Sequence, residues 1–215
     1  MKYQELYDEL TSGTVSRGLR RWVLCLLDDI AAGRSPIKAV RHPLGFVCLP
    51  VERGGENGVC VHLWSGELRR AGRTTSDVHC HSWDLVSYIL YGQVRNEIAT
   101  VDDDGAATHR VLEVVSAGDV DSISPTGRLV RYIGGVSGTY GAGEVYSLPA
   151  GVFHRSVIPE GTETATIALG SGRAGASDLS LGPLDTRPHR VTRQRCDDEE
   201  TARAARLAAE HMART

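Results

Sequence analysis

The segment HCHSWDLVSYILYG, residues 79–92, is the most informative part of this chain. Successive side chains on a β-strand point to opposite faces, so the imidazoles of His79 and His81 point the same way and can share one ion. Neutral imidazole is the commonest protein ligand for iron, copper, nickel and zinc. The segment therefore predicts two metal ligands on one strand.

A second segment, GEVYSLPAGVFHR at residues 143–155, carries a third histidine. His154 follows Gly143, Pro149 and Gly151, residues that tighten a strand-turn-strand connection and allow close approach of a second strand. This arrangement predicts that His154 lies on another strand, as the third ligand of the same ion.

Together the two segments resemble the two motifs of the cupin superfamily. The first motif reads roughly G-x5-H-x-H-x(3,4)-E-x6-G, and Gly72, His79, His81 and Gly92 fit it with one extra residue after the first glycine. The second reads G-x5-P-x-G-x2-H and is matched without a gap by residues 143–154. The resemblance implies an all-β cupin fold, a double-stranded β-helix or jelly-roll barrel.

One position departs from the family pattern. The glutamate ligand of the first motif is replaced here by Leu85, which cannot bind a metal. Asp84 is adjacent, but a shift of one residue along a strand reverses the face. We therefore expect three histidines and no carboxylate, with two or three coordination positions open to water, substrate or dioxygen.

Within the superfamily, the chain most resembles the cysteine dioxygenase type, which binds Fe(II) by three histidines. The segment HRSVIPEGTETATIALGSG, from residue 154, and the segment VCVHLW, residues 59–64, are similar to strands of that family. Those enzymes often carry a cysteine at the glutamate position and a tyrosine beyond the last histidine, where this chain has Leu85 and about Ser171. The resemblance implies Fe(II), with another divalent transition ion as the alternative, and does not extend to the thiol-oxidising groups.

Three aromatic residues are candidates for contact with the substrate. Trp83 follows the histidine pair and could line the pocket or simply pack at the barrel rim. Tyr91 shares the strand face of Leu85, and Tyr146 lies on a strand near the second motif. Either tyrosine could donate a hydrogen bond to bound oxygen or substrate, although tyrosines are also common in half-buried strands.

A basic residue is needed if the substrate is an acid, because the planar guanidinium matches a carboxylate. Arg53 lies upstream at a distance comparable to the carboxylate-holding arginine of the cysteine dioxygenases, in what looks like a turn; Arg41, Arg131 and Arg155 are alternatives. His62 alternates with its strand neighbours and could point inward near the ligands, or be a packed barrel histidine.

The rest of the sequence divides into three regions. Residues 1–38 show apolar residues at helical spacing and predict helices that pack on the barrel. Residues 39–172 contain short β-rich runs separated by turn residues, with hairpin connections expected at 53–58 and 101–107, and predict the barrel itself. Residues 173–215 predict an irregular extension followed by a C-terminal helix, acidic at its start and arginine-rich toward its end.

Composition narrows the functional class. The chain has 215 residues and a net charge of −3, which gives no field to attract nucleic acid or an anionic membrane. No apolar run approaches the roughly 20 residues needed to span a bilayer, and the amino terminus lacks signal-peptide character. Five scattered cysteines without a C-x-x-C pair favour reduced thiols. We expect a cytoplasmic protein, monomer or homodimer.

These observations predict a mononuclear iron dioxygenase that oxidises a small, anionic metabolite with dioxygen, such as an amino acid, thiol or keto acid derivative. The first alternative is a metal-dependent lyase, isomerase or epimerase that polarises its substrate without oxygen. The second is a non-catalytic cupin that binds a ligand.

Overall fold

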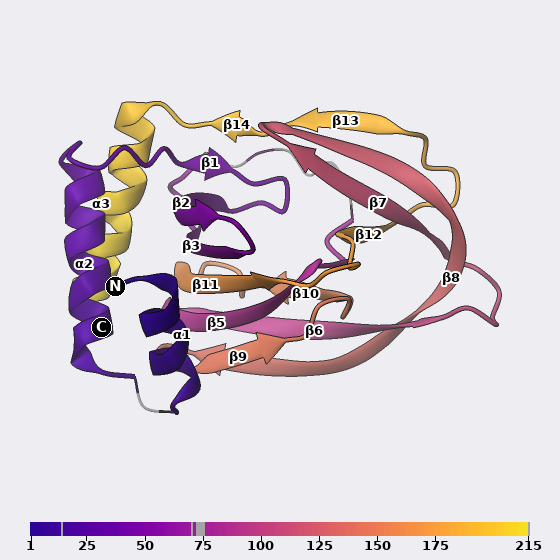
Figure 1. The fold of residues 1–215 in the computed structure, drawn as a ribbon, viewed down its shortest axis with the longest axis horizontal. Helices are drawn as coiled ribbons and strands as arrows, with labels where there is room; N and C mark the ends of the chain where they lie inside the picture. Colours follow the sequence, from indigo (N-terminus) through magenta and orange to yellow (C-terminus); the bar gives the residue numbers. More distant parts are fainter. Residues whose placement is uncertain (14, 70, 72–75, 215) are drawn as a thin grey trace.

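Helices lie at the two ends of the chain and β-strands fill the part between them (Figure 1). The computed structural model describes residues 1–13, 15–69, 71 and 76–214, so Gly72 of the first motif lies outside the described residues. The helices are α1 (Tyr3–Thr11), α2 (Arg17–Ala31) and α3 (Asp198–Arg214). None of the helices within these described ranges is long and apolar enough to cross a membrane.

The strands form two antiparallel sheets of seven strands each, which confirms the predicted all-β jelly roll with terminal helices. The first sheet contains, in spatial order, β14 (Gln194–Arg195), β1 (Val40–Arg41), β2 (Val47–Gly54), β3 (Asn57–Trp64), β11 (Thr164–Gly172), β5 (Trp83–Tyr91) and β9 (Val145–Leu148). The second contains β13 (His189–Thr192), β8 (Val120–Gly141), β6 (Gln93–Asp102), β10 (His154–Val157), β4 (His79–Cys80), β12 (Leu179–Gly182) and β7 (His109–Ala117).

The long strand β8 closes the second sheet. Its C-terminal part pairs with β6 and its N-terminal part pairs with β7, the strand at the far edge of the same sheet. Because one strand joins both edges, this sheet curls around on itself, as Figure 1 shows. Closure of this kind removes open sheet edges and encloses an interior.

The helices cover the outer face of the first sheet, where α2 and α3 lie side by side (Figure 1). Leu19 and Val23 of α2 are fully buried in one core with Val61 of β3. Because side chains alternate along a strand, Cys60 and His62 then point to the opposite face, into the barrel. Burial of the apolar face thus decides which side chains of the first sheet can reach a ligand.

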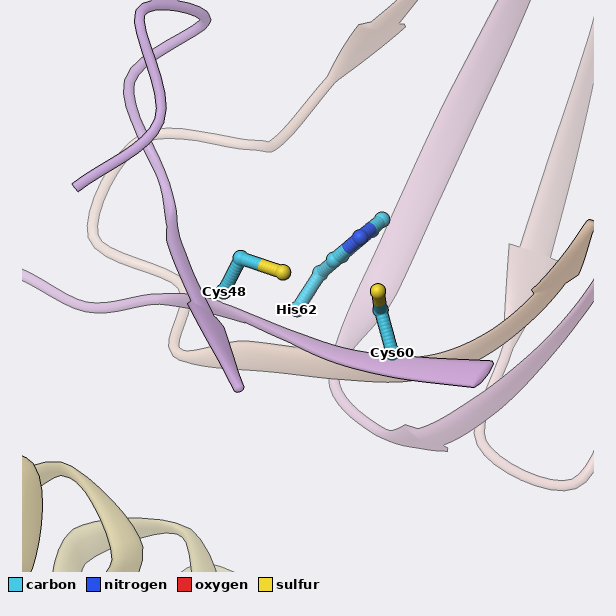
Figure 2. A group of neighbouring side chains, drawn as sticks. All are labelled: Cys48, Cys60 and His62. Atoms are coloured by element: carbon cyan, nitrogen blue, oxygen red, sulfur yellow. The ribbon is translucent and has the colours of Figure 1, made fainter. Parts of the chain in front are cut away.

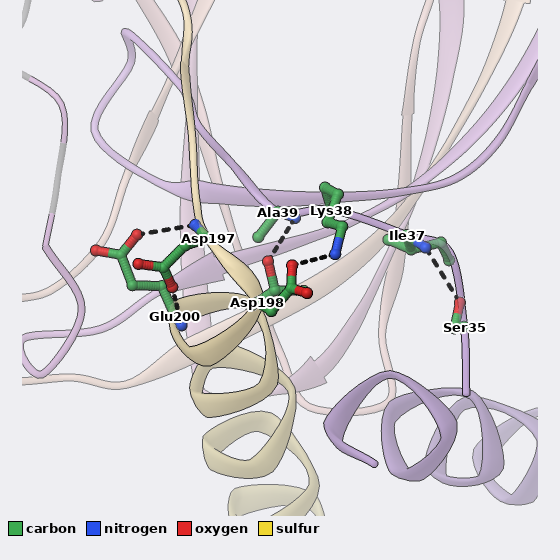
Figure 3. Close-up of polar contacts among 8 residues, drawn as sticks. Ser35, Ile37, Lys38, Ala39, Asp197, Asp198 and Glu200 are labelled. Carbon is green, nitrogen blue, oxygen red and sulfur yellow. Dashed lines mark hydrogen bonds and ion pairs between the residues drawn. The ribbon is translucent and has the colours of Figure 1, made fainter. Parts of the chain in front are cut away.

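A capping box begins helix α3 and a neighbouring contact ties it to the segment before β1 (Figure 3). Asp197 Oδ1 accepts a hydrogen bond from the Glu200 amide at 2.8 Å, and Glu200 Oε2 accepts one from the Asp197 amide at 3.1 Å. The buried hydroxyl of Thr201 accepts a hydrogen bond from the Ala39 amide at 3.1 Å. The first two contacts satisfy amides at the start of the helix, and the third fixes α3 to the segment before β1.

The fold agrees with one of the three predictions about connections and differs from the other two. Residues 53–58 do form a hairpin, with Gly54 opposite Asn57 and Gly55 at a φ of +63°. Arg53, however, lies on β2 and not in a turn. Residues 101–107 are not a hairpin, because β6 and β7 each pair with β8 and not with each other.

The segment after residue 172 is more regular than the expected irregular extension. It contributes β12 to the middle of the second sheet, β13 to its edge and β14 to the edge of the first. Turn-forming composition concealed these strands, because they are only two to four residues long and are held by neighbouring strands. This segment therefore completes the barrel.

Candidate metal centre

Neighbouring strands bring the three predicted histidine ligands together. His154, the first residue of β10, pairs directly with His79 of β4. His81 follows β4, and its carbonyl accepts a hydrogen bond from the Gly151 amide at 2.9 Å. The turn of the second motif is thus fastened to the histidine pair of the first, which places the loop before His154 against His81.

The three imidazoles are close enough to share one ion. Their nearest ligand nitrogens all lie within 4.8 Å of one another. The ring centroids are 4.5 Å apart for His79 and His154, 4.8 Å for His79 and His81, and 5.0 Å for His81 and His154. A transition ion bound by imidazoles at about 2.1 Å fits among rings at this spacing.

Backbone carbonyls orient two of these rings. The Nδ1 of His79 lies 2.9 Å from the Asp77 carbonyl oxygen, and the Nδ1 of His154 lies 3.2 Å from the Val152 carbonyl oxygen. A carbonyl only accepts, so each Nδ1–H is the donor. The lone pair of each ring is therefore on Nε2, as is usual for histidines whose other nitrogen binds a metal.

Burial keeps the cluster neutral. Desolvation lowers the pKa of His79, lowers that of His81 well below its usual value and, reinforced by the charge of His79, lowers that of His154 to about 3. At neutral pH all three rings therefore keep a free lone pair. The donor set is uncharged and would not compensate the charge of a divalent ion.

These pKa values predict that the free energy of unfolding of the metal-free protein decreases as the pH is lowered. Below about pH 6.5, the ordinary histidine pKa, the unfolded chain binds a proton at residue 154 that the folded chain does not bind until about pH 3. The free energy of unfolding should therefore fall as the pH drops through this window, by about 1 kcal/mol for each such histidine between about pH 7 and pH 5.5. Urea unfolding of chelator-treated protein measures this loss. His154→Gln should show a smaller loss, and an unchanged slope in that variant would contradict the prediction.

The histidines open onto a cavity of about 430 Å³ between the sheets. Trp83 lines it and stacks on His81, with centroids 3.9 Å apart and planes at 20°. Leu85, at the position where cupins carry a glutamate, is buried in the cavity wall. Asp84 points elsewhere: it pairs with Arg173 and accepts a hydrogen bond from the Ala150 amide at 2.9 Å. The three histidines thus have no carboxylate beside them from this strand.

The two candidate tyrosines have different positions. Tyr146 lines the cavity together with Ser87 and Ser156, and burial raises its pKa. Tyr91 does not face the ligands as expected. It packs in the core between sheet and helices and stacks on His211 of α3 with centroids 5.1 Å apart.

A β-bulge explains the orientation of Tyr91. In the pairing of β5 with β11, Ile89 lies opposite Thr166 and Tyr91 lies opposite Ala165, so that Leu90 is the extra residue. One extra residue reverses the alternation of all residues beyond it. Tyr91 therefore points to the outer face, whereas Leu85 and Ser87 before the bulge point inward.

The two remaining candidates for contact with the substrate lie on the cavity wall opposite the three histidines. His62 and Arg53 both line the cavity, as do Cys48 and Cys60, and the charges of these two cysteines raise the pKa of Arg53 against the effect of burial. A hydrogen bond from Cys48, with His62 and Arg53 nearby, lowers the pKa of Cys60. Cys48 joins this group only through the pairing of β2 with β3, whereas the two-residue spacing of Cys60 and His62 on one strand is visible in the sequence.

Two of the three comparisons with known proteins found no match. No family model matches the chain, and no curated protein sequence matches it. Among solved structures, hydroquinone 1,2-dioxygenase from Sphingomonas sp. TTNP3 with 4-hydroxybenzoate bound is similar, with 18% identity and a TM-score of 0.33. The similarity covers 58% of this chain and 65% of that chain, less than two thirds of its length.

Two antiparallel sheets enclose a cavity, and strands of the two sequence motifs bring a three-histidine cluster to its wall. The result is a closed antiparallel β-barrel whose three-histidine cluster is suited to a metal ion.

Proposed function

We propose that this protein is a cupin and a mononuclear non-haem iron dioxygenase that acts on a small anionic metabolite, such as an amino, thiol or keto acid. The observation that carries the proposal is the neutral three-histidine cluster, with Leu85 in place of a carboxylate, on the wall of a cavity of about 430 Å³. Such a donor set leaves positions for both a substrate and dioxygen.

The residues present fit a divalent transition ion. His79 and His154 would hold it through Nε2, because their Nδ1–H groups are donated to backbone carbonyls, and His81 would be the third ligand. Fe(II) is the ion we propose, and when bound it would supply the one-electron chemistry that dioxygen requires. The histidines themselves serve to position and orient, because they carry no charge and exchange no proton at neutral pH.

The charge of a bound divalent ion would favour an acid. Three neutral ligands leave the charge of a divalent ion uncompensated, so an anionic substrate is favoured there. Arg53 lines the opposite wall, where its guanidinium can pair with a substrate carboxylate. Trp83 holds the ring of His81 in place, and Leu85 excludes water from that side.

Tyr146 supplies the remaining polar contact. Its pKa is raised by burial, so the phenol stays protonated, and Ser87 and Ser156 line the cavity with it. In the proposed reaction it donates a hydrogen bond to the substrate or to dioxygen and orients it. It is not a general base.

Oxygen uptake tests this proposal. Protein purified without air and loaded with Fe(II) should consume dioxygen only when the right member of a panel of amino, thiol and keto acids is present. Tyr146→Phe should slow this reaction, whereas Tyr91→Phe, which removes the same atom on the outer face of the sheet, should not. Turnover without oxygen in zinc- or nickel-loaded protein would instead indicate a lyase or isomerase. Tight ligand binding with no turnover would indicate a binding protein.

A further inference from the structure

A second group of metal-ligating side chains lies in the same cavity and has no part in the proposed reaction. It consists of Cys48 on β2 and Cys60 and His62 on β3. Cys48 is directly opposite His62 in the antiparallel register, and Cys60 is two residues before His62. Figure 2 shows the three side chains on the same side of the two strands, away from the helices.

The spacing of these ligands suits a tetrahedral zinc ion. Their two sulfur atoms and one imidazole nitrogen all lie within 4.8 Å of one another. Zn–S bonds of about 2.3 Å and Zn–N bonds of about 2.1 Å at tetrahedral angles separate the ligand atoms by roughly 3.5 to 3.8 Å. Small side-chain rotations therefore bring all three into coordination distance, without movement of the strands.

The surroundings hold these ligands in place. His62 is packed between aromatic rings, with its centroid 4.4 Å from that of Phe46 and 6.0 Å from that of Trp64 at an edge-on angle. Cys48 is buried, with 2% of its surface exposed. Arg53 lines the same wall, and a positive charge near the two sulfur atoms stabilises them as thiolates.

We propose that Cys48, Cys60 and His62 form a second metal site, a Cys2His zinc site whose fourth position opens to the cavity. Two thiolates and one neutral imidazole balance the charge of Zn²⁺. Thiolates favour zinc, whereas an all-imidazole set also suits iron, so the two sites differ in the ion that they select. Because both sites line one cavity, a ligand bound between them would meet an ion on each wall.

The number of ions bound per chain tests this second site. Full-length protein, kept reduced and stripped with a chelator, is dialysed against Zn²⁺ and analysed for metal. Wild-type protein should bind two ions per chain, Cys60→Ala and His62→Ala one each, and the double variant Cys60→Ala with His154→Ala none. Cys196→Ala removes another buried cysteine, outside the cavity, and should still bind two. Circular dichroism checks that each variant is folded.

Cobalt substitution reports the sulfur ligands directly. Co²⁺ bound at this site should give an intense thiolate-to-cobalt charge-transfer band in wild-type protein and in His154→Ala, and the band should be absent in Cys60→Ala. If the band is present while the histidine cluster binds nothing, the second site stands and the proposed oxygenase does not. Reduced wild-type protein that binds a single ion, lost only in His154→Ala, would overturn the second site. So would finding a Cys48–Cys60 disulfide that forms in place of metal binding.

Discussion

His154→Ala is expected to abolish iron binding at the histidine cluster and to reduce substrate-dependent oxygen uptake by more than about a hundredfold, because loss of even an outer partner of a metal ligand typically costs 10- to 100-fold. His154 is almost completely buried, with 2% of its surface exposed, and it pairs directly with His79. Its removal leaves two imidazoles, which hold a divalent ion far more weakly than three. Metal analysis after anaerobic Fe(II) loading and an oxygen electrode measure the two effects.

A matched control separates loss of a ligand from loss of any histidine. His109 lies on β7, contacts Tyr132 and does not line the cavity. His109→Ala should therefore retain full iron content and oxygen uptake. If His154→Ala retained iron at the wild-type level while folded, the histidine cluster would not be the metal centre, and the oxygenase proposal would fail with it.

Gly92→Ala is expected to lower the free energy of unfolding by about 3 kcal/mol or more, since it combines a positive φ with a clash against backbone. Gly92 connects β5 to β6 at a φ of +78°. A Cβ built on it would lie 2.8 Å from the Thr164 Cα and closer still to the Glu163 carbonyl oxygen. The Thr164 hydroxyl beneath it is held by hydrogen bonds of 3.2 Å to the amide and carbonyl of Gln93, so it cannot move aside freely.

Gly118 provides the comparison for this substitution. It also has a positive φ, +60°, but a Cβ there would have no atom within 4 Å. Gly118→Ala should therefore cost only about 1 to 2 kcal/mol, the ordinary cost of a left-handed conformation for an L-residue. Urea unfolding of the two variants measures the difference. Equal losses would show that the contact with β11 contributes nothing.

The three-histidine cluster could be predicted from the sequence because the spacings that define it each span only a few residues. The two-residue spacing of His79 and His81 places both rings on one face wherever a strand forms. The glycines and proline of residues 143–151 predict the turn that delivers His154. The substitution of Leu85 for glutamate could also be read directly, and the structure places that side chain in the cavity wall.

Residues whose orientation depends on distant partners could not be assigned in this way. The strand alternation predicted that Tyr91 faces the ion, but the bulge at Leu90 exists only because β5 pairs with β11, a strand far away in the chain. The connection of Cys48 with Cys60 and His62 likewise requires the register of β2 against β3. Neither feature leaves a signature in spacing alone.

The sequence by itself determined that this chain forms a β-barrel flanked by helices and that three of its histidines can bind one metal ion. Hydrophobic periodicity and turn residues give this information because each depends on only a few neighbouring positions. Only the tertiary structure decided that Tyr146 and not Tyr91 lines the cavity, that the segment after residue 172 completes the second sheet, and that two cysteines and His62 meet across a strand pair. The physical reason is that pairing register and bulges are set by contacts between segments far apart in the chain, where a shift of one residue reverses the face of every side chain beyond it.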